Sequence, residues 1–222
     1  MGRNKNRRRG GDPAFPRLLG ERLCLDYVNT VESPLDSHPR EHLLGYPDLV
    51  RWGGHVGVLD AAAADQLLQA AAREPDRATV VFGRARALRE ALTRIFRAIA
   101  RGNMVEEADL GHLRAEYLAA LGPARLAPTA GGYGWAWDVD DESLDRPLWA
   151  VARSAVEVLT TGELVRVKEC SGAGDCGWLF YDTSKNHSRR WCSMEGCGSR
   201  VKMRQQYARA HAQKSRLEMH EP

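Results

Sequence analysis

The sequence predicts a mainly α fold of the α+β class, in which a helical N-terminal domain with a small β-hairpin precedes a small cysteine-rich unit that ends in a basic helix. Three observations support this prediction. Several segments repeat apolar residues at three- and four-residue spacing, one glycine-rich stretch alternates aromatic residues, and four cysteines gather between residues 170 and 197. With 222 residues, 43% of them hydrophobic, the chain can bury one sizeable core.

Charge is distributed unevenly along the chain. Residues 1–11 hold five Lys or Arg and no acid, residues 12–163 hold 16 basic and 23 acidic residues, and residues 164–222 hold 11 basic and six acidic residues. Cationic ends around an anionic middle indicate a polyanionic partner for the ends. We therefore expect three parts with these boundaries.

Residues 1–11 are predicted to form a disordered basic arm, because they contain no apolar side chain beyond Met1. Such an arm either follows DNA phosphates and the minor groove or serves only as a solubilising tail. No apolar run approaches the roughly 18 residues that cross a bilayer, and the N-terminus has no signal-peptide pattern. We expect a cytoplasmic protein in a reducing compartment, with no membrane partner.

Residues 18–31 have a dense apolar pattern that favours a short strand or buried segment. Cys24 is interpreted as a small buried hydrophobe. Asp26 and Asn29 interrupt this run, and we expect them to cap a neighbouring helix rather than to face a pocket. Nearby histidines have no carboxylate partner at metal-ligand spacing and are interpreted as surface or loop residues; these are His38, His42 and His55.

Helices are predicted where apolar periodicity meets capping signals. They are a short helix capped by Asp48 that ends near residues 53–54, a second from Asp60 to Pro75, and three more at 77–101, at about 106–121 and at 145–162. Arginines line the polar side of the helix at 77–101. We interpret them as a solvated face, because the surrounding sequence is acidic.

Residues 124–140 break the helical pattern with glycines, while Tyr133, Trp135 and Trp137 alternate. This pattern predicts a small β-hairpin. Its aromatic side chains either pack against the helices, which burial tendencies favour, or line a ligand pocket.

Four of the five cysteines follow a strand predicted at 164–168 and have the layout of a zinc site. Five residues separate the first pair, fifteen lie between the pairs and four separate the second pair, so two tight loops can face one tetrahedral Zn²⁺. Disulfides or unrelated core thiols are the alternatives, and a reducing compartment disfavours the first. The predicted ligands of one structural zinc ion are Cys170, Cys176, Cys192 and Cys197.

The run CGWLFYDTSKNHSRRWCSMEGCGSRVKMR at 176–204 resembles the CGNR-type zinc finger, a C-terminal module of bacterial transcription regulators. LCLDYVNTVES at 23–33 and the helical middle of the chain resemble the ABATE domain that usually precedes this finger. Together the resemblances cover nearly the whole chain. The family is named after the motif Cys-Gly-Asn-Arg. In this chain the motif departs at one position, because Ser199 replaces the Asn.

After Cys197 the chain favours a helix that is rich in cations and poor in apolar contacts. A phosphate-rich partner explains such a helix better than a core does, although a solvated basic tail is the alternative. Arg200 and Arg204 are the candidates for base edges. The candidates for phosphate are Arg189, Arg190, Lys202 and Arg209, with Ser184, Lys185, Asn186 and Ser188 as added donors.

The leading hypothesis is a zinc-dependent transcription regulator whose finger binds double-stranded DNA. Its N-terminal domain would sense a small-molecule effector or form a homodimer. The alternative is a zinc-shaped interaction module that binds RNA or an acidic protein. We do not expect an enzyme, because no nucleophile–base pair, phosphate loop or catalytic metal triad is visible.

Overall fold

The computed structural model describes residue 12 and residues 14–137, 143–172, 174 and 176–218. The predicted basic arm at 1–11 lies outside these residues. The helices are α1 (Leu23–Val28), α2 (Tyr46–His55), α3 (Ala61–Arg73), α4 (Pro75–Arg101), α5 (Glu107–Leu121), α6 (Arg146–Thr161) and α7 (Ser199–Glu218). The strands are β1 (Val31–Glu32), β2 (Arg40–Glu41), β3 (Ala124–Thr129), β4 (Gly132–Trp137), β5 (Val167–Glu169) and β6 (Leu179–Tyr181).

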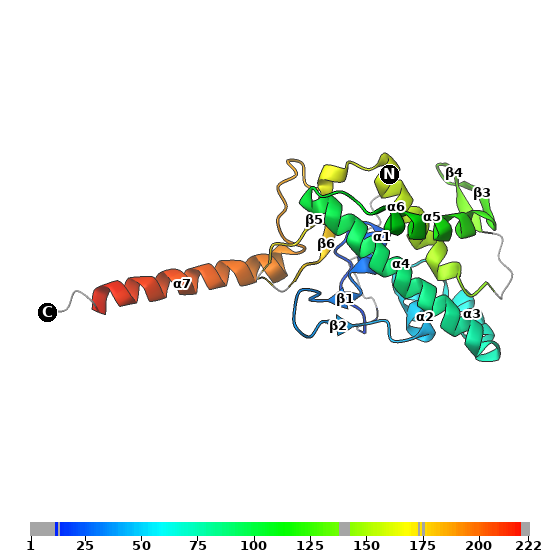
Figure 1. The fold of residues 1–222 in the computed structure, drawn as a ribbon, viewed down its shortest axis with the longest axis horizontal. Coiled ribbons are helices and arrows are strands. Elements are labelled where there is room, and N and C mark those ends of the chain that lie inside the picture. Colours follow the sequence, from blue (N-terminus) through cyan, green and yellow to red (C-terminus); the bar gives the residue numbers. More distant parts are fainter. Residues whose placement is uncertain (1–11, 13, 138–142, 173, 175, 219–222) are drawn as a thin grey trace.

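Helix α4 is the long central element, and it packs against α1, α2, α3, α5 and β5 (Figure 1). Pro75 lies in its first turn, and Gly102 ends it in the left-handed conformation with φ 71°. Its apolar stripe is buried from Val81 to Phe96, which confirms the predicted helix and its inward face.

Most arginines of α4 are paired with carboxylates, which the predicted solvated face did not include, although Arg86 is exposed and Arg94 and Arg101 stay about half exposed. Arg89 is buried and donates two hydrogen bonds to the Glu41 carboxylate, and Arg94 pairs with Asp109 at 2.7 Å. The other pairs are Arg84 with Glu116 and Asp145, and Arg97 and Arg101 with Glu169. These carboxylates neutralise most of the cations that a nucleic acid could use.

The segment around residues 23–28, for which we predicted a short strand or a buried segment, is buried but forms the helix α1 and not a strand. It is six residues long and buried on nearly every side, so its sequence has no amphipathic period to indicate a helix. Glu21 turns the chain into α1 with φ 61°, and the Asp26 carboxylate accepts a hydrogen bond of 2.7 Å from the Gly20 N–H. Asp26 therefore holds the turn before its own helix and does not cap a neighbouring one.

The ends of α2 and α3 also differ in detail. Helix α2 begins after Gly45, one turn earlier than an Asp48 cap would place it, and Asp48 accepts a hydrogen bond from the Leu44 N–H at 2.9 Å. Asp60 caps α3 as predicted, with its carboxylate 2.8 Å from the Ala63 nitrogen.

Strands β3 and β4 form the predicted antiparallel hairpin up to Trp137, while residues 138–140 lie outside the described part of the chain. Its aromatic side chains do not share one role. Tyr133 and Trp135 are exposed, whereas Trp137 lies near Trp149 of α6 and donates a hydrogen bond to the Ala120 carbonyl at 3.0 Å.

The cysteine-rich unit is docked on the helical core. A 3₁₀ turn at Leu164–Arg166 replaces the first part of the strand predicted at 164–168, and β5 then pairs with β6. Val167, Leu179 and Tyr181 belong to the same buried cluster as the helices. Helix α7 leaves this unit as a rod that projects from the body (Figure 1). Within the described residues, no helix is both long and apolar enough to span a membrane.

Candidate metal centre and nucleic-acid interface

The four predicted zinc ligands come together at the junction of β5, β6 and the π turn at Met194–Gly198. All four are buried, and their sulfurs lie within 4.8 Å of one another. The Cys192 Sγ lies 3.7 Å from the Cys176 Sγ and 3.6 Å from the Cys197 Sγ. A zinc tetrahedron with Zn–S bonds of about 2.3 Å has edges of about 3.8 Å, so the cluster fits one zinc ion.

The protein around the sulfurs is shaped to hold thiolates. The Cys192 N–H donates to the Cys170 Sγ at 3.2 Å, and Arg200 donates to the Cys197 Sγ at 3.1 Å. A Cβ on Gly172 would lie 2.5 Å from the Cys197 Cβ and 2.9 Å from its Sγ, so only glycine fits against the cluster.

The thiols of the cluster influence one another's ionisation. Hydrogen bonds from the Cys176 and Cys192 thiols lower the pKa of Cys170 to about 2. The contact with Cys170 raises the pKa of Cys176 to about 12, and that of Cys192 is raised for the same reason. Without metal, one thiolate thus prevents its neighbours from ionising, whereas a divalent cation releases their protons. The cluster is the site of one structural zinc ion, because four thiolates leave no open position for a reacting water.

Asn29 joins this unit to the helical domain. Its side-chain nitrogen donates to the Leu179 carbonyl at 2.8 Å, and its side-chain oxygen accepts from the Leu179 N–H at 3.0 Å. Trp178 adds a hydrogen bond of 3.0 Å from its indole nitrogen to the Val31 carbonyl. The prediction that the Asn29 side chain caps a neighbouring helix is therefore wrong, because its amide satisfies the backbone of β6; Asn29 is the C-cap residue of its own helix α1 through its main-chain N–H.

The loop between β6 and Cys192 is built around the fully buried carboxylate of Asp182. It accepts from Lys168 Nζ at 2.7 Å, from the Arg189 N–H at 3.0 Å and from the Ser184 N–H at 2.9 Å. Burial alone would raise the pKa of Asp182, but these hydrogen bonds lower it below its ordinary value. Lys168 also donates to the His187 carbonyl, so one ion pair fixes the loop that delivers Cys192.

Arg189, a predicted phosphate contact, lies inside the finger. Its guanidinium donates to the carbonyls of Trp191 at 3.0 Å, Leu19 at 3.2 Å and Cys192, and it lies 4.4 Å above the Phe180 ring. Phosphate would have to compete with these partners. Arg190 is exposed instead, and its guanidinium lies 5.6 Å from the Trp191 ring.

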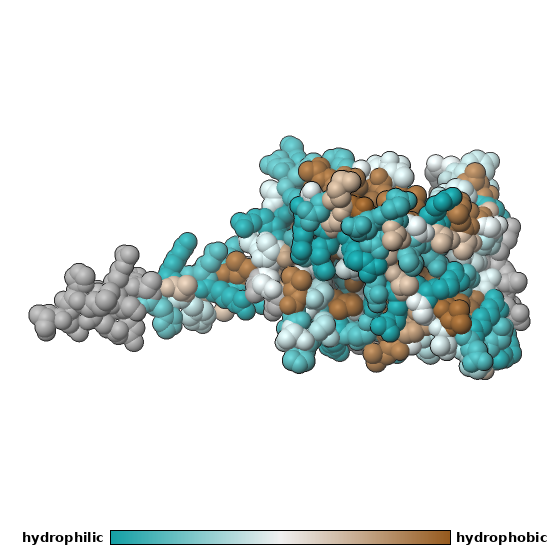
Figure 2. Space-filling view, viewed as in Figure 1, coloured by the Kyte–Doolittle hydropathy of each residue, from teal (hydrophilic) through white to brown (hydrophobic). Residues whose placement is uncertain are grey.

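The remaining predicted DNA contacts lie on α7. Lys202, Arg204 and Arg209 are exposed, as is Arg200 at the helix start despite its contact with Cys197. On the face that Figure 2 shows, the surface of these turns is mainly hydrophilic. Ser199, at the position that departs from the family signature, donates to the Met194 carbonyl at 3.0 Å and so stabilises the turn that carries Cys197.

A cationic groove beside the metal centre was not predicted from the sequence. Its volume is about 380 Å³, and Cys176, Cys192 and Cys197 form one wall. Arg17, Arg40 and Arg200 also line it, together with His42 and Glu32. His42, predicted as a surface or loop residue, lies in the loop after β2, but its side chain is only 5% exposed and its Nδ1 lies 2.7 Å from the Ala14 carbonyl oxygen. No local pattern relates these residues, because they come from three separate segments.

Two family models match the chain. The ABATE model, whose description reads "Putative stress-induced transcription regulator", matches residues 21–162. The CGNR zinc finger model matches residues 166–210, which include all four cysteines of the metal centre. The chain has no match among the curated proteins.

Proposed function

We propose, from the premise that the chain belongs to the ABATE family and carries a CGNR zinc finger, that it is a zinc-dependent transcription regulator whose finger binds double-stranded DNA. The N-terminal domain senses a signal or pairs two copies. A cytoplasmic location suits this function, because DNA is accessible there and thiols stay reduced.

Helix α7 is the observation that carries the proposal. It contains 20 residues, about 30 Å at the usual rise, and it projects away from the body (Figure 1). Between residues 199 and 217 the sequence has no acidic residue, and among the side chains that the structure describes its exposed large apolar ones are Met203 and Tyr207. Because a helix without packing partners is marginal in water, this one needs a partner of opposite charge. A DNA groove meets that need.

The periodicity of α7 separates two sets of basic residues. Arg204, Tyr207 and His211 follow Arg200 at spacings of four, three and four, so they share one face. Lys202 and Arg209 are seven residues apart and share the opposite face. We assign Arg200 and Arg204 to base edges, and Lys202, Arg209 and Arg190 to phosphates.

Two arginines near the cysteine cluster, Arg200 and Arg189, also connect DNA binding to the metal. Arg200 contacts the Cys197 sulfur, so loss of zinc changes the position of a base-reading side chain. Arg189 is reassigned from phosphate binding to positioning, because its guanidinium holds the carbonyls that flank Cys192.

Selection from a random duplex-DNA pool at about 0.15 M salt tests the proposal, because nonspecific phosphate binding is weak there. The comparison is between wild type, Cys192→Ser and the control Cys24→Ala, which changes the one cysteine outside the cluster. We expect wild type and the control to enrich one motif and Cys192→Ser to enrich none. If zinc-loaded wild type enriches nothing, DNA reading is rejected and RNA or an acidic protein becomes the partner to test.

A further inference from the structure

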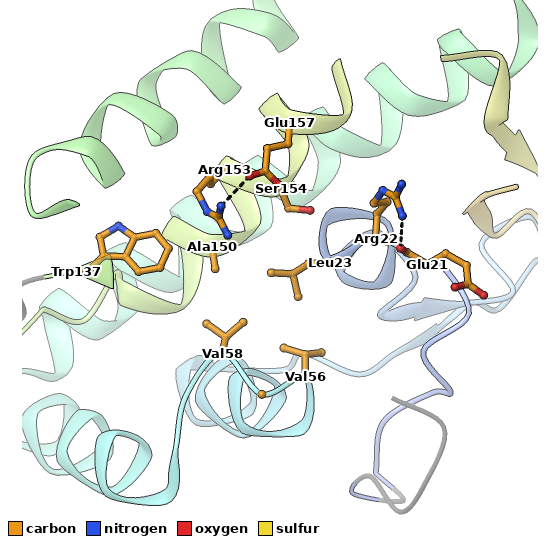
Figure 3. Close-up of a pocket in the computed structure, with 11 residues that line it drawn as sticks. Glu21, Arg22, Leu23, Val56, Val58, Trp137, Ala150, Arg153, Ser154 and Glu157 are labelled. Carbon is orange, nitrogen blue, oxygen red and sulfur yellow. Dashed lines mark hydrogen bonds and ion pairs between the residues drawn. The ribbon is translucent and has the colours of Figure 1, made fainter. Parts of the chain in front are cut away.

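A second cavity lies in the helical domain, on the side of α1 that faces α6 (Figure 3). Its volume is about 440 Å³, within the range of about 300–1,000 Å³ that holds small ligands. The apolar part of the lining comes from α1, from the turn after α2, and from β4 and α6. It consists of Leu23, Val56, Val58, Trp137 and Ala150.

Two arginines and two glutamates line this cavity, but Glu21 pairs with Arg189 outside the lining, so one lining arginine is left without a carboxylate partner among the described residues. Glu157 pairs with Arg153 at 2.7 Å, and Glu21 lies 3.6 Å from Arg189 of the finger. Arg22 donates to the Glu21 carbonyl at 2.9 Å, but it has no carboxylate partner among the residues that the structure describes. One anionic group on a ligand would supply a partner for Arg22.

Arg153 provides a second polar contact for that anion. Its guanidinium carbon lies 5.8 Å from the centre of the Trp137 ring. Its Nε is buried and has no hydrogen-bond partner in the described part of the chain. The Arg153 side chain is 31% exposed, so a carboxylate can accept from its guanidinium, while a flat apolar body packs against Trp137 and the valines.

The rim of the cavity is continuous with the finger. Arg22 lies 3.9 Å above the Tyr181 ring of β6, so an anion that attracts Arg22 draws it from that ring. Glu21, held at φ 61°, pairs with Arg189, which in turn binds the Cys192 carbonyl. A ligand at this rim therefore contacts residues that also contact the finger, which links its binding to the docking of the finger.

We propose that this cavity binds a small aromatic monocarboxylate between Arg22, Arg153 and Trp137, and that its occupancy loosens the docking of the finger. This inference rests on the proposed function only for its consequence, which is control of DNA binding. Ligand binding itself involves no DNA.

The first experiment measures binding to the zinc-loaded full-length protein by calorimetry, with benzoate, phenylacetate and indole-3-acetate as probes. Benzamide is the neutral control for benzoate. We expect saturable binding of at least one acid, and benzamide about tenfold weaker than benzoate where benzoate is that acid. Failure of all three acids to saturate the protein rejects the ligand class.

Arginine variants locate the site. Arg22→Met and Arg153→Met keep most of the apolar stem, and each should weaken acid binding about tenfold. Arg86→Met, on the exposed side of α4, is the matched control and should bind as wild type does. Wild-type affinity in both cavity variants would place the ligand elsewhere and overturn the proposal.

A second readout tests the connection to the finger. Zinc loss to a chelator should be several-fold faster with the acid bound than without it. In Glu21→Gln, which removes the charge facing Arg189, the acid should still bind but accelerate zinc loss less. An unchanged rate in wild type rejects the loosening. Because no DNA is present, both measurements remain valid if DNA selection fails.

Discussion

Asn29 and Leu179 exchange two hydrogen bonds although they lie 150 positions apart in the sequence. The amide completes the backbone hydrogen bonding of β6 in the way that a neighbouring strand would. Because Leu179 belongs to the main core, this pair fixes the metal-binding unit to the helical domain.

Replacement of Asn29 should therefore undock the finger without removing its metal. Asn29→Ala leaves a buried N–H and a buried carbonyl without partners, at a cost of about 2–4 kcal/mol. We expect a lower unfolding midpoint, faster hydrogen exchange at the Leu179 amide and full zinc content. Asn103→Ala, at an exposed position, is the control. Unchanged exchange at Leu179 would argue against this role.

Gly172 should tolerate no side chain, because a Cβ there overlaps the Cys197 side chain. Gly172→Ala is expected to lower zinc affinity by at least tenfold, measured by competition with a chelator. Gly196→Ala is the matched control in the same unit, since its Cβ would come no closer than 3.6 Å to Ser193 Oγ. Equal affinities of the two variants would show that the cluster can shift.

Arg189 and Arg190 are neighbours with different predicted effects. Arg189→Ala removes the donor to three main-chain carbonyls, so it should speed zinc loss and reduce stability by about 2–4 kcal/mol. Arg190→Ala should leave zinc retention unchanged. Parallel chelator-competition and thermal-unfolding measurements separate them, and identical curves would contradict the positioning role of Arg189.

DNA variants test the two faces of α7. Arg204→Ala should relax sequence preference at one or two base pairs, which costs about 1–3 kcal/mol of discrimination. Lys202→Ala should weaken binding to all duplexes by the same factor. It should also lower the number of counterions released on binding, measured from the salt dependence of the affinity, by about one. Binding titrations over several salt concentrations, with the selected and a scrambled duplex, distinguish these outcomes. The same profile for both variants would reject the assignment of faces.

The Arg89–Glu41 pair predicts a pH dependence of stability. Burial would raise the pKa of Glu41, but hydrogen bonds from Arg89 and the Leu43 N–H lower it below the ordinary value of 4.5. A lowered folded-state pKa stabilises the protein above that ordinary value, and the contribution is lost as pH falls through the folded-state pKa.

Glu41→Gln should thus cost about 3–5 kcal/mol near pH 7, because it leaves Arg89 buried without its carboxylate. The difference from wild type should shrink below pH 4.5. Urea unfolding at several pH values measures it, and Glu90→Gln at an exposed site is the control. A difference that stays constant down to pH 3 would contradict the linkage.

The sequence predicted what local patterns encode. The metal centre follows from cysteine spacing, and α4 follows from a long amphipathic repeat with Gly102 at its end. Helix α1 was missed because a six-residue segment buried on nearly every side has no periodicity. The partner of Asn29 was missed because it lies far along the chain.

The arginines show the same limit. The pattern of charges in a sequence cannot distinguish an exposed guanidinium that is available to phosphate from one that donates to main-chain carbonyls. Arg189 is of the second kind. The cavity around Trp137 and Arg153 was equally hidden, because its walls come from segments between residues 21 and 157.

The attachment of α7 has a consequence for geometry. The N-terminal end of α7 follows directly on the turn that carries Cys197 of the metal cluster. That cluster is joined to the helical domain through β5 and β6. The rod therefore keeps one direction relative to the body, unlike a finger on a flexible tether. For the proposed regulator bound to DNA, this fixes the side of the duplex that the body occupies. Two copies on neighbouring sites should tolerate changes of spacing only in whole turns of the double helix.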